Sequence, residues 1–267
     1  MKRQRRTILI TTWPFAAADQ RPLTALKRAG FRVLEPARRR KLKLTAAEVR
    51  RYLPLVDGVI AGTEKYEAGM LAAAGPRLQL ISRVGIGVDN MDFHACARRG
   101  AEVAYTPGAS TEAVAELALG LMLDCVRGVS GADRQVRAGA WSRYVGRELA
   151  ALTVGIIGLG RIGKRVAELL QPFGCRVLAN DLAPDRAFAR RHGIGLATKD
   201  RIYRTADVVS LHVPLTPLTR GLVGAVTVKK MKRAGVLINT ARGGLVDERA
   251  LAVALKRGRL AAAGLDV

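Results

Sequence analysis

The sequence predicts an α/β protein with two doubly wound parallel sheets, and three observations support this fold class. Short runs rich in β-branched residues alternate with helix-type patterns along the chain, which is typical of parallel strands joined by right-handed crossovers. The alternation is interrupted at Pro107-Gly108 and resumes after a long apolar helix. A glycine-rich turn then follows the first strand of the second series.

The first series predicts one domain, residues 1–106. Its expected strands cover residues 7–12, 32–34, 58–61, 78–82 and 102–104. Ser110 or Thr111 then caps a helix that runs to about Val126, because both residue types satisfy the free N–H groups of a first helical turn. We expect this helix, residues 110–128, to be the hinge to a second domain, residues 107–267.

The glycine-rich turn, residues 158–163, has the pattern G-x-G-x-x-G between a buried strand and a helical stretch. In this context Gly158 permits a tight turn, Gly160 lets a pyrophosphate approach the backbone, and Gly163 lets the helix pack on the strand. The second series contains six expected strands, the number of the dinucleotide-binding Rossmann fold: residues 153–157, 176–179, 195–197, 207–213, 235–239 and 262–266.

Asp181 lies about 20 residues beyond the glycine turn, at the end of the second of these strands, where a carboxylate binds both ribose hydroxyls. Its charge would repel a 2′-phosphate, so we expect NAD rather than NADP as the cofactor. Arg186 weakens this preference, because an arginine nearby accommodates the extra phosphate. A glycine turn without a ligand is the less favoured interpretation.

The composition indicates a globular protein. The chain has 267 residues, 49% of them hydrophobic, which is enough for two domains with their own cores. Its longest apolar stretches are too short to span a bilayer, so we expect a cytoplasmic protein with no membrane contact. The three cysteines, Cys96, Cys125 and Cys175, lie far apart without metal-type spacing, and we expect buried thiols and no metal site.

The formal charge of +23 is unusual for such a protein. Residues 1–50 hold 14 lysines and arginines against three acids, so much of the excess lies in the first fifth of the chain. One interpretation is a patch that attracts phosphates, and the other is a set of solvated positions with no partner. We favour the second and do not expect a nucleic-acid partner, because no aromatic residues are interleaved with the charges.

Five stretches together resemble the D-isomer-specific 2-hydroxyacid dehydrogenase family, and within it the phosphoglycerate dehydrogenase branch. They are residues 81–90, 106–109 with 113–123, 158–163, 210–217 and 239–248. The resemblance implies a flavodoxin-like substrate domain, an NAD-binding Rossmann domain, and hydride transfer between a D-2-hydroxy acid and NAD. It also implies a homodimer formed through the long helix and the arm at residues 131–144, which includes Trp141.

By the same resemblance Arg242 is the catalytic arginine that grips the substrate carboxylate and polarises the forming carbonyl. Gly85, Ile86 and Gly87 would offer backbone N–H groups to that carboxylate. An ordinary surface arginine and a plain tight turn are the alternative interpretations. The further residues implied are Arg83 for the substrate, Arg161 and Ile162 for the pyrophosphate, Val213 and Pro214 for the adenosine, and Thr240, Ala241 and Asp266 for the nicotinamide end.

Two departures from the family pattern bear on function. By the same resemblance the family's general base, a histidine paired with a glutamate, lies downstream of the strand that ends at Val267, so we expect a C-terminally truncated chain that binds NADH but is nearly inactive. The histidines present, His94, His192 and His212, do not replace it convincingly. Gly62 stands where phosphoglycerate-specific relatives tend to carry an arginine. Either Lys65 or Arg83 substitutes for it, or the ligand is another 2-hydroxy or 2-keto acid, and the sequence does not choose between these alternatives.

Two alternative functions belong to a different class. The first is a non-catalytic NAD-binding interaction protein of the corepressor type, which would keep Asp181 and the glycines without the chemistry. The second is a basic nucleic-acid partner, for which steeply salt-dependent DNA binding is the discriminating observation.

Overall fold

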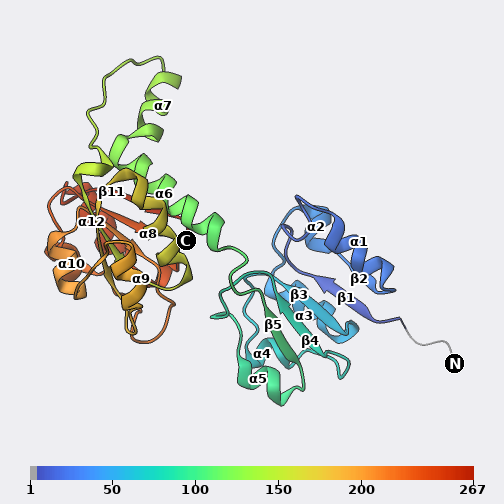
Figure 1. Cartoon of the computed structure of the whole chain (residues 1–267). Coiled ribbons are helices and arrows are strands. Elements are labelled where there is room, and N and C mark those ends of the chain that lie inside the picture. Colours follow the sequence, from blue (N-terminus) through green and yellow to red (C-terminus); the bar gives the residue numbers. More distant parts are fainter. Residues whose placement is uncertain (1–4) are drawn as a thin grey trace. The chain divides into compact units, whose positions relative to one another are not determined.

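The computed structural model describes residues 5–267, and the chain forms two compact units, unit 1 (Met1–Ser110) and unit 2 (Thr111–Val267). Unit 1 carries a five-stranded parallel sheet in the order β2-β1-β3-β4-β5, which is the flavodoxin-like order (Figure 1). Its elements are β1 (Thr7–Ile10), α1 (Arg21–Arg28), β2 (Arg32–Leu34), α2 (Pro36–Arg40), α3 (Ala46–Tyr52), the 3-10 turn η1 (Leu53–Leu55), β3 (Gly58–Ala61), α4 (Ala68–Leu71), β4 (Leu80–Arg83), α5 (Phe93–Arg98) and β5 (Glu102–Tyr105).

Unit 2 carries a six-stranded parallel sheet in the order β11-β10-β9-β6-β7-β8, which is the Rossmann order. The predicted fold class is therefore confirmed. The elements of unit 2 are α6 (Thr111–Arg127), α7 (Val129–Arg137), η2 (Leu149–Ala151), β6 (Thr153–Ile157), α8 (Arg161–Leu170), η3 (Gln171–Phe173), β7 (Arg176–Asn180), α9 (Arg186–Arg191), β8 (Gly195–Leu196), α10 (Lys199–Thr205), β9 (Val208–Leu211), α11 (Ala225–Lys230), β10 (Gly235–Asn239), η4 (Gly243–Leu245), α12 (Glu248–Lys256) and β11 (Leu260–Leu265).

Each sheet is covered on both faces because alternate side chains of a strand point to opposite sides. In β6, Val154 and Ile156 pack into a core with α6 and α8, whereas Ile157 packs into a second core with α10, α11 and α12. In unit 1, Leu9 of β1 joins the core beneath α3, α4 and α5, and Ile10 joins the core beneath α1. An apolar core on each face of both sheets thus holds the strand ends in fixed positions.

Several strands are shorter than predicted, and the strand predicted at residues 207–213 shows why. β9 ends at Leu211, in register with Ile157 of β6 and Asn239 of β10, which are the last residues of those strands. Beyond Leu211 the chain has no ladder on either side to continue. His212 and Val213 therefore lie in the loop after the strand, not within it.

In both sheets an aspartate carboxylate accepts a hydrogen bond from the first residue of the first strand. The N–H of Thr7 donates to Asp57 at 2.6 Å, and the N–H of Thr153 donates to Asp207 at 2.9 Å. Burial alone would raise the pKa of Asp57, but hydrogen bonds from Arg77 and from the Thr7 N–H outweigh it and hold the pKa below its usual range. Each carboxylate replaces a missing ladder partner at the start of its strand.

Candidate functional site

The predicted cofactor residues gather at the carboxyl edge of the unit 2 sheet. The register pairs Ile157 with Leu211, Leu211 with Asn239, and Asn239 with Leu265. The next residue of each strand therefore falls in one row across four neighbouring strands. That row consists of Gly158, His212, Thr240 and Asp266, and this is the edge where open α/β sheets bind ligands.

The glycine turn has the geometry that its sequence predicts. Gly158 has a φ of +100°, and a Cβ there would lie 2.6 Å from the His212 carbonyl oxygen. A Cβ on Gly163 would lie 1.9 Å from the Gly158 carbonyl oxygen. A Cβ on Gly160 would meet nothing within 4 Å, so the space above it is open. Two of the glycines are required by the fold, and the third is required only if a ligand approaches.

Helix α8 begins at this turn without a capping side chain. Its N-cap, Gly160, has no side chain that could accept a hydrogen bond from the first turn. In that turn Arg161 is exposed and Ile162 is half-buried. The free N–H groups and the positive end of the helix dipole are available to an anion. This is the position that the sequence assigns to the pyrophosphate.

Asp181 holds the glycine turn as well as facing the predicted ribose position. Its Oδ2 accepts from the Leu159 N–H at 2.7 Å, and its Oδ1 accepts from the Ala183 N–H at 2.9 Å. Each carboxylate oxygen still has a lone pair for a hydroxyl donor. Arg186 is exposed at the start of α9. The bond to Leu159 was not predicted, although the two residues lie on adjacent strand ends.

The chain beyond β10 presents the predicted catalytic arginine. The Asn239 side chain accepts from the N–H groups of Ala241 (3.1 Å) and Arg242 (3.3 Å) and donates to the Arg242 carbonyl at 2.9 Å. This closed turn fixes the backbone from which the Arg242 side chain extends. The Thr240 hydroxyl is buried without a hydrogen-bond partner among the described residues, and the Asp266 N–H donates to the Asn239 carbonyl at 3.1 Å.

The loop after β9 places His212, Val213 and Pro214 beside the glycine turn. Val213 is half-buried and would meet a Cβ on Gly158, and Pro214 is exposed. The His212 Nε2 shares a hydrogen bond of 2.8 Å with the Ser210 hydroxyl, and burial lowers the pKa of His212 to about 4. A neutral imidazole held in this way is a poor proton acceptor at pH 7. His94 lies in the first turn of α5, and His192 is the C-cap of α9.

In unit 1 the predicted substrate residues follow β4. Gly85 has a φ of +130°, and a Cβ there would lie 2.7 Å from a guanidinium nitrogen of Arg83, so the arginine lies against this loop. The Gly85 N–H donates to the Thr106 hydroxyl at 3.1 Å and is therefore occupied. The N–H groups of Ile86 and Gly87 make no hydrogen bond to the described residues. Of the three backbone N–H groups predicted to bind a carboxylate, those of Ile86 and Gly87 remain available.

Next to this loop lies a buried acid that sequence reasoning missed. Glu64 is 6% exposed, and its Oε2 accepts from the Gly62 N–H at 2.9 Å and from the Thr11 hydroxyl at 3.0 Å. The side chain of Lys65, one of the two candidate phosphate contacts, is 77% exposed and pairs with Glu67 on the surface. The sequence signal was an acid two residues after Gly62, and this acid indicates no site until the fold brings Thr11 beside it.

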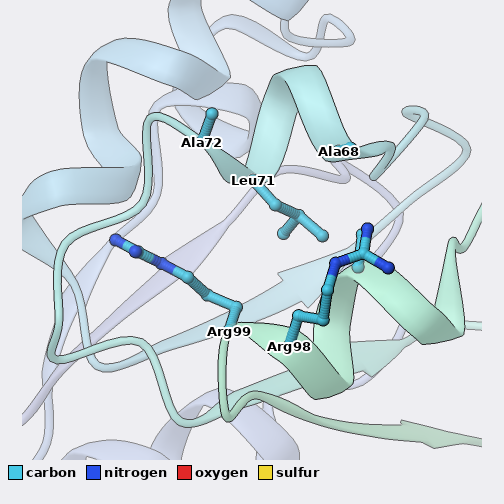
Figure 2. Close-up of a pocket in the computed structure, with 6 residues that line it drawn as sticks. Ala68, Leu71, Ala72, Arg98 and Arg99 are labelled. Atoms are coloured by element: carbon cyan, nitrogen blue, oxygen red, sulfur yellow. The ribbon is translucent and has the colours of Figure 1, made fainter.

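A shallow hollow on unit 1 lies apart from these strand edges. It holds about 170 Å³ and is lined by residues of α4 and α5 and by the residues that follow them, among them Leu71, Arg98 and Arg99 (Figure 2). None of the predicted substrate residues lines it.

Within residues 5–267, no group of three or more His, Cys, Asp or Glu side chains is placed to hold a metal ion. No helix within these described residues is both long enough and apolar enough to cross a bilayer.

The chain is similar to known dehydrogenases over most of its length. It is 40% identical over 230 residues to a D-3-phosphoglycerate dehydrogenase of Archaeoglobus fulgidus, covering 85% of this chain and 44% of that relative. It is 38% identical over 222 residues to a hydroxypyruvate reductase of Thermotoga maritima, covering 82% of this chain and 72% of that relative. The chain thus spans less than half the length of the first relative.

Solved structures show the same similarity. The TT0316 protein of Thermus thermophilus matches with a TM-score of 0.85 and 35% identity over 98% of this chain and 81% of that chain. A D-lactate dehydrogenase of Aquifex aeolicus, solved with NAD and lactic acid, matches with a TM-score of 0.82 and 30% identity over 98% of this chain and 77% of that chain.

Residues 119–267 match the model of a family described as D-isomer specific 2-hydroxyacid dehydrogenase, NAD binding domain. This range contains the glycine turn, Asp181 and Arg242, so the prediction of NAD as the cofactor is confirmed at the level of the family. The chain belongs to the D-isomer specific 2-hydroxyacid dehydrogenase family.

Proposed function

We propose that this protein is an NAD-dependent oxidoreductase that acts on a small D-2-hydroxy acid or the corresponding 2-keto acid. The observation that carries the proposal is the row of residues at the carboxyl edge of the unit 2 sheet. At one end of the row lies Gly158, where no other residue fits, and beside Thr240 lies the turn that Asn239 closes onto Arg242. NAD supplies the hydride acceptor and donor of the reaction.

The protein's own residues bind and orient. The first turn of α8 and the open space over Gly160 receive the pyrophosphate, and Asp181 accepts from the ribose hydroxyls. The unpartnered hydroxyl of Thr240 is a donor or acceptor for the carboxamide end. The Arg242 guanidinium, whose Nη1 donates to the Ala241 carbonyl at 2.6 Å, is the planar donor group for a carboxylate or a developing oxyanion. In unit 1, the N–H groups of Ile86 and Gly87 are the donors for a carboxylate, with Arg83 beside them.

Gly160→Ala tests the cofactor site. The added methyl meets no protein atom, and the φ of −75° suits alanine, so the variant should fold with a loss of about 1 kcal/mol or less. The methyl would nevertheless fill the space of the pyrophosphate, and NADH should bind at least about tenfold more weakly. NADH fluorescence titration measures this.

Gly120→Ala is the matched control, because Gly120 of α6 also has open space at its Cβ and lies outside the glycine turn. It should bind NADH as the unaltered chain does. Unchanged NADH binding in Gly160→Ala would contradict the placement of the pyrophosphate.

We also propose a homodimer that forms through α6, α7 and the arm that follows α7. Figure 1 shows α7 and this arm extending away from the sheet of unit 2. The arm carries Trp141, which is 90% exposed, and Val145, which is 88% exposed. Large apolar side chains that are exposed in the single chain are typical of a surface that a partner covers. We propose a cytoplasmic location for this dimer, because Cys96, Cys125 and Cys175 are free thiols, as in a reducing compartment.

The Trp141→Glu variant should convert the dimer to a monomer, because it places a charge in the proposed interface. Light scattering should give about twice the chain mass of 28.7 kDa for the unaltered protein and the chain mass for the variant. Val226→Glu, at an exposed apolar residue of α11, should remain dimeric. A monomeric unaltered chain at micromolar concentration would contradict the proposal.

A further inference from the structure

Glu64 stands at the edge of unit 1 where the predicted substrate residues lie. It follows β3, and the N–H of Val84, which follows β4, donates to the Ala61 carbonyl at 2.9 Å. Neighbouring parallel strands lie about 4.8 Å apart, so the turn at Gly62 and the loop at Gly85 are adjacent. Thr11, which follows β1, donates to the Glu64 carboxylate from the other side. The ends of β1 and β3 thus bind this carboxylate, and the end of β4 lies beside the turn that carries it.

The charge of Glu64 is not neutralised by a cation in the part of the chain that the structure describes. Its carboxylate forms no ion pair there, and its two hydrogen bonds, from Thr11 and Gly62, both come from neutral groups to Oε2. Tyr66 is fully buried beside it, and burial together with the Glu64 charge raises the pKa of the phenol, which stays protonated. A negative charge in a partly desolvated position acts over a longer range than one in water.

Gly62 and Glu64 occupy the available space together. A Cβ on Gly62 would lie 2.9 Å from the Thr12 Cβ and 3.1 Å from both Glu64 carboxylate oxygens. The Asn90 side chain donates to the carbonyls of Gly62 (3.1 Å) and Glu64 (2.7 Å) and fixes the turn. A longer side chain at residue 62 could therefore not enter unless the carboxylate moved out. The turn at Gly62 therefore presents an acid, Glu64, whereas the neighbouring Gly85 loop carries the guanidinium of Arg83.

We infer that Glu64 determines substrate specificity and selects unphosphorylated 2-hydroxy acids against phosphorylated ones. This inference rests on the proposed function. A phosphate dianion beside an uncompensated carboxylate is repelled, whereas a hydroxyl or a hydrogen at the same position is not. A hydroxyl would also donate to the Glu64 oxygen that has no protein donor. The ligand class is a small acid that carries its single negative charge on the carboxylate next to C2.

Binding of D-glycerate and D-3-phosphoglycerate to the NADH-saturated chain tests the inference by calorimetry. These acids differ only in the phosphate. D-glycerate should bind at least about tenfold more tightly, and Glu64→Gln should reduce this preference by about tenfold because the amide keeps the shape and loses the charge. Glu64→Asp should keep the preference. Glu67→Gln removes the same charge three residues away on the surface, and should also leave the preference unchanged.

The outcomes separate the two proposals. Tighter binding of D-3-phosphoglycerate to the unaltered chain would overturn the role of Glu64 and leave the proposed function intact. An unchanged preference in a folded Glu64→Gln variant would do the same. NADH binding without binding of either acid would overturn the proposed function, and the inference with it. The comparison of the two acids on the unaltered chain is decisive even if Glu64→Gln does not fold.

Discussion

Replacing Gly163 with alanine should destabilise unit 2 by about 3 kcal/mol and weaken NADH binding by at least about 100-fold. The reason is a backbone contact, since the new Cβ would lie 1.9 Å from the Gly158 carbonyl oxygen and 3.3 Å from Ile156 Cγ2. A flexible side chain could move away from the methyl, but a carbonyl of the glycine turn cannot do so without moving the turn.

The two effects share this cause. To relieve the contact, α8 must shift away from β6, which breaks the packing of Val166 and Leu170 on Val154 and Ile156. The same shift moves the free N–H groups of the first helical turn away from the pyrophosphate position. Stability and cofactor affinity should therefore fall together, whereas Gly160→Ala should lower the affinity alone.

Thermal denaturation with hydrogen exchange of peptides from β6 and α8 measures the stability, and NADH titration measures the affinity. Gly120→Ala again serves as a control, here with an expected gain of about 0.5–1 kcal/mol because alanine favours the interior of α6. A Gly163→Ala variant that melts and binds NADH like the unaltered chain would show that the turn relaxes without cost.

The glycine turn illustrates what sequence patterns can predict. Its conformation depends on residues within one strand, one turn and one helix, so the spacing of Gly158, Gly160 and Gly163 was sufficient. The alternation of strands and helices was also sufficient to predict parallel sheets with right-handed crossovers, whereas the order of the strands was implied only by the family resemblance. Strand ends were less accessible, since β9 ends where β6 and β10 end and not where its own apolar run ends.

The site in unit 1 shows where sequence reasoning was insufficient. Glu64 and Thr11 are separated by 53 residues, and Gly85 and Thr106 by 21, yet each pair shares a hydrogen bond. Such contacts depend on how strand ends are brought together. Sequence analysis accordingly expected a free N–H at Gly85, which Thr106 occupies, and assigned no role to Glu64.

Asp181 gives the second large effect, a change in cofactor preference. Asp181→Asn removes the charge that would repel a 2′-phosphate and keeps an oxygen that can accept from the Leu159 N–H. NADH affinity should fall by about tenfold, because an amide binds the ribose hydroxyls less strongly than a carboxylate. NADPH affinity should hold or rise, helped by Arg186, so the preference for NADH over NADPH should fall by about 100-fold.

Asp181→Ala separates charge from turn geometry. It removes the acceptor as well, so the buried Leu159 N–H loses its partner at a cost of about 1–3 kcal/mol, and both cofactors should bind more weakly than to Asp181→Asn. The ratio of the two affinities should nevertheless match that of Asp181→Asn.

Asp185→Asn removes the same charge four residues on, from a carboxylate that pairs with Lys164 at 2.6 Å and caps α9, and should leave the ratio nearly unchanged. If the ratio moved equally in Asp185→Asn, the preference would come from the general field around α9 and not from Asp181. A ratio that moves only at Asp181 assigns cofactor choice to the carboxylate that also holds the glycine turn.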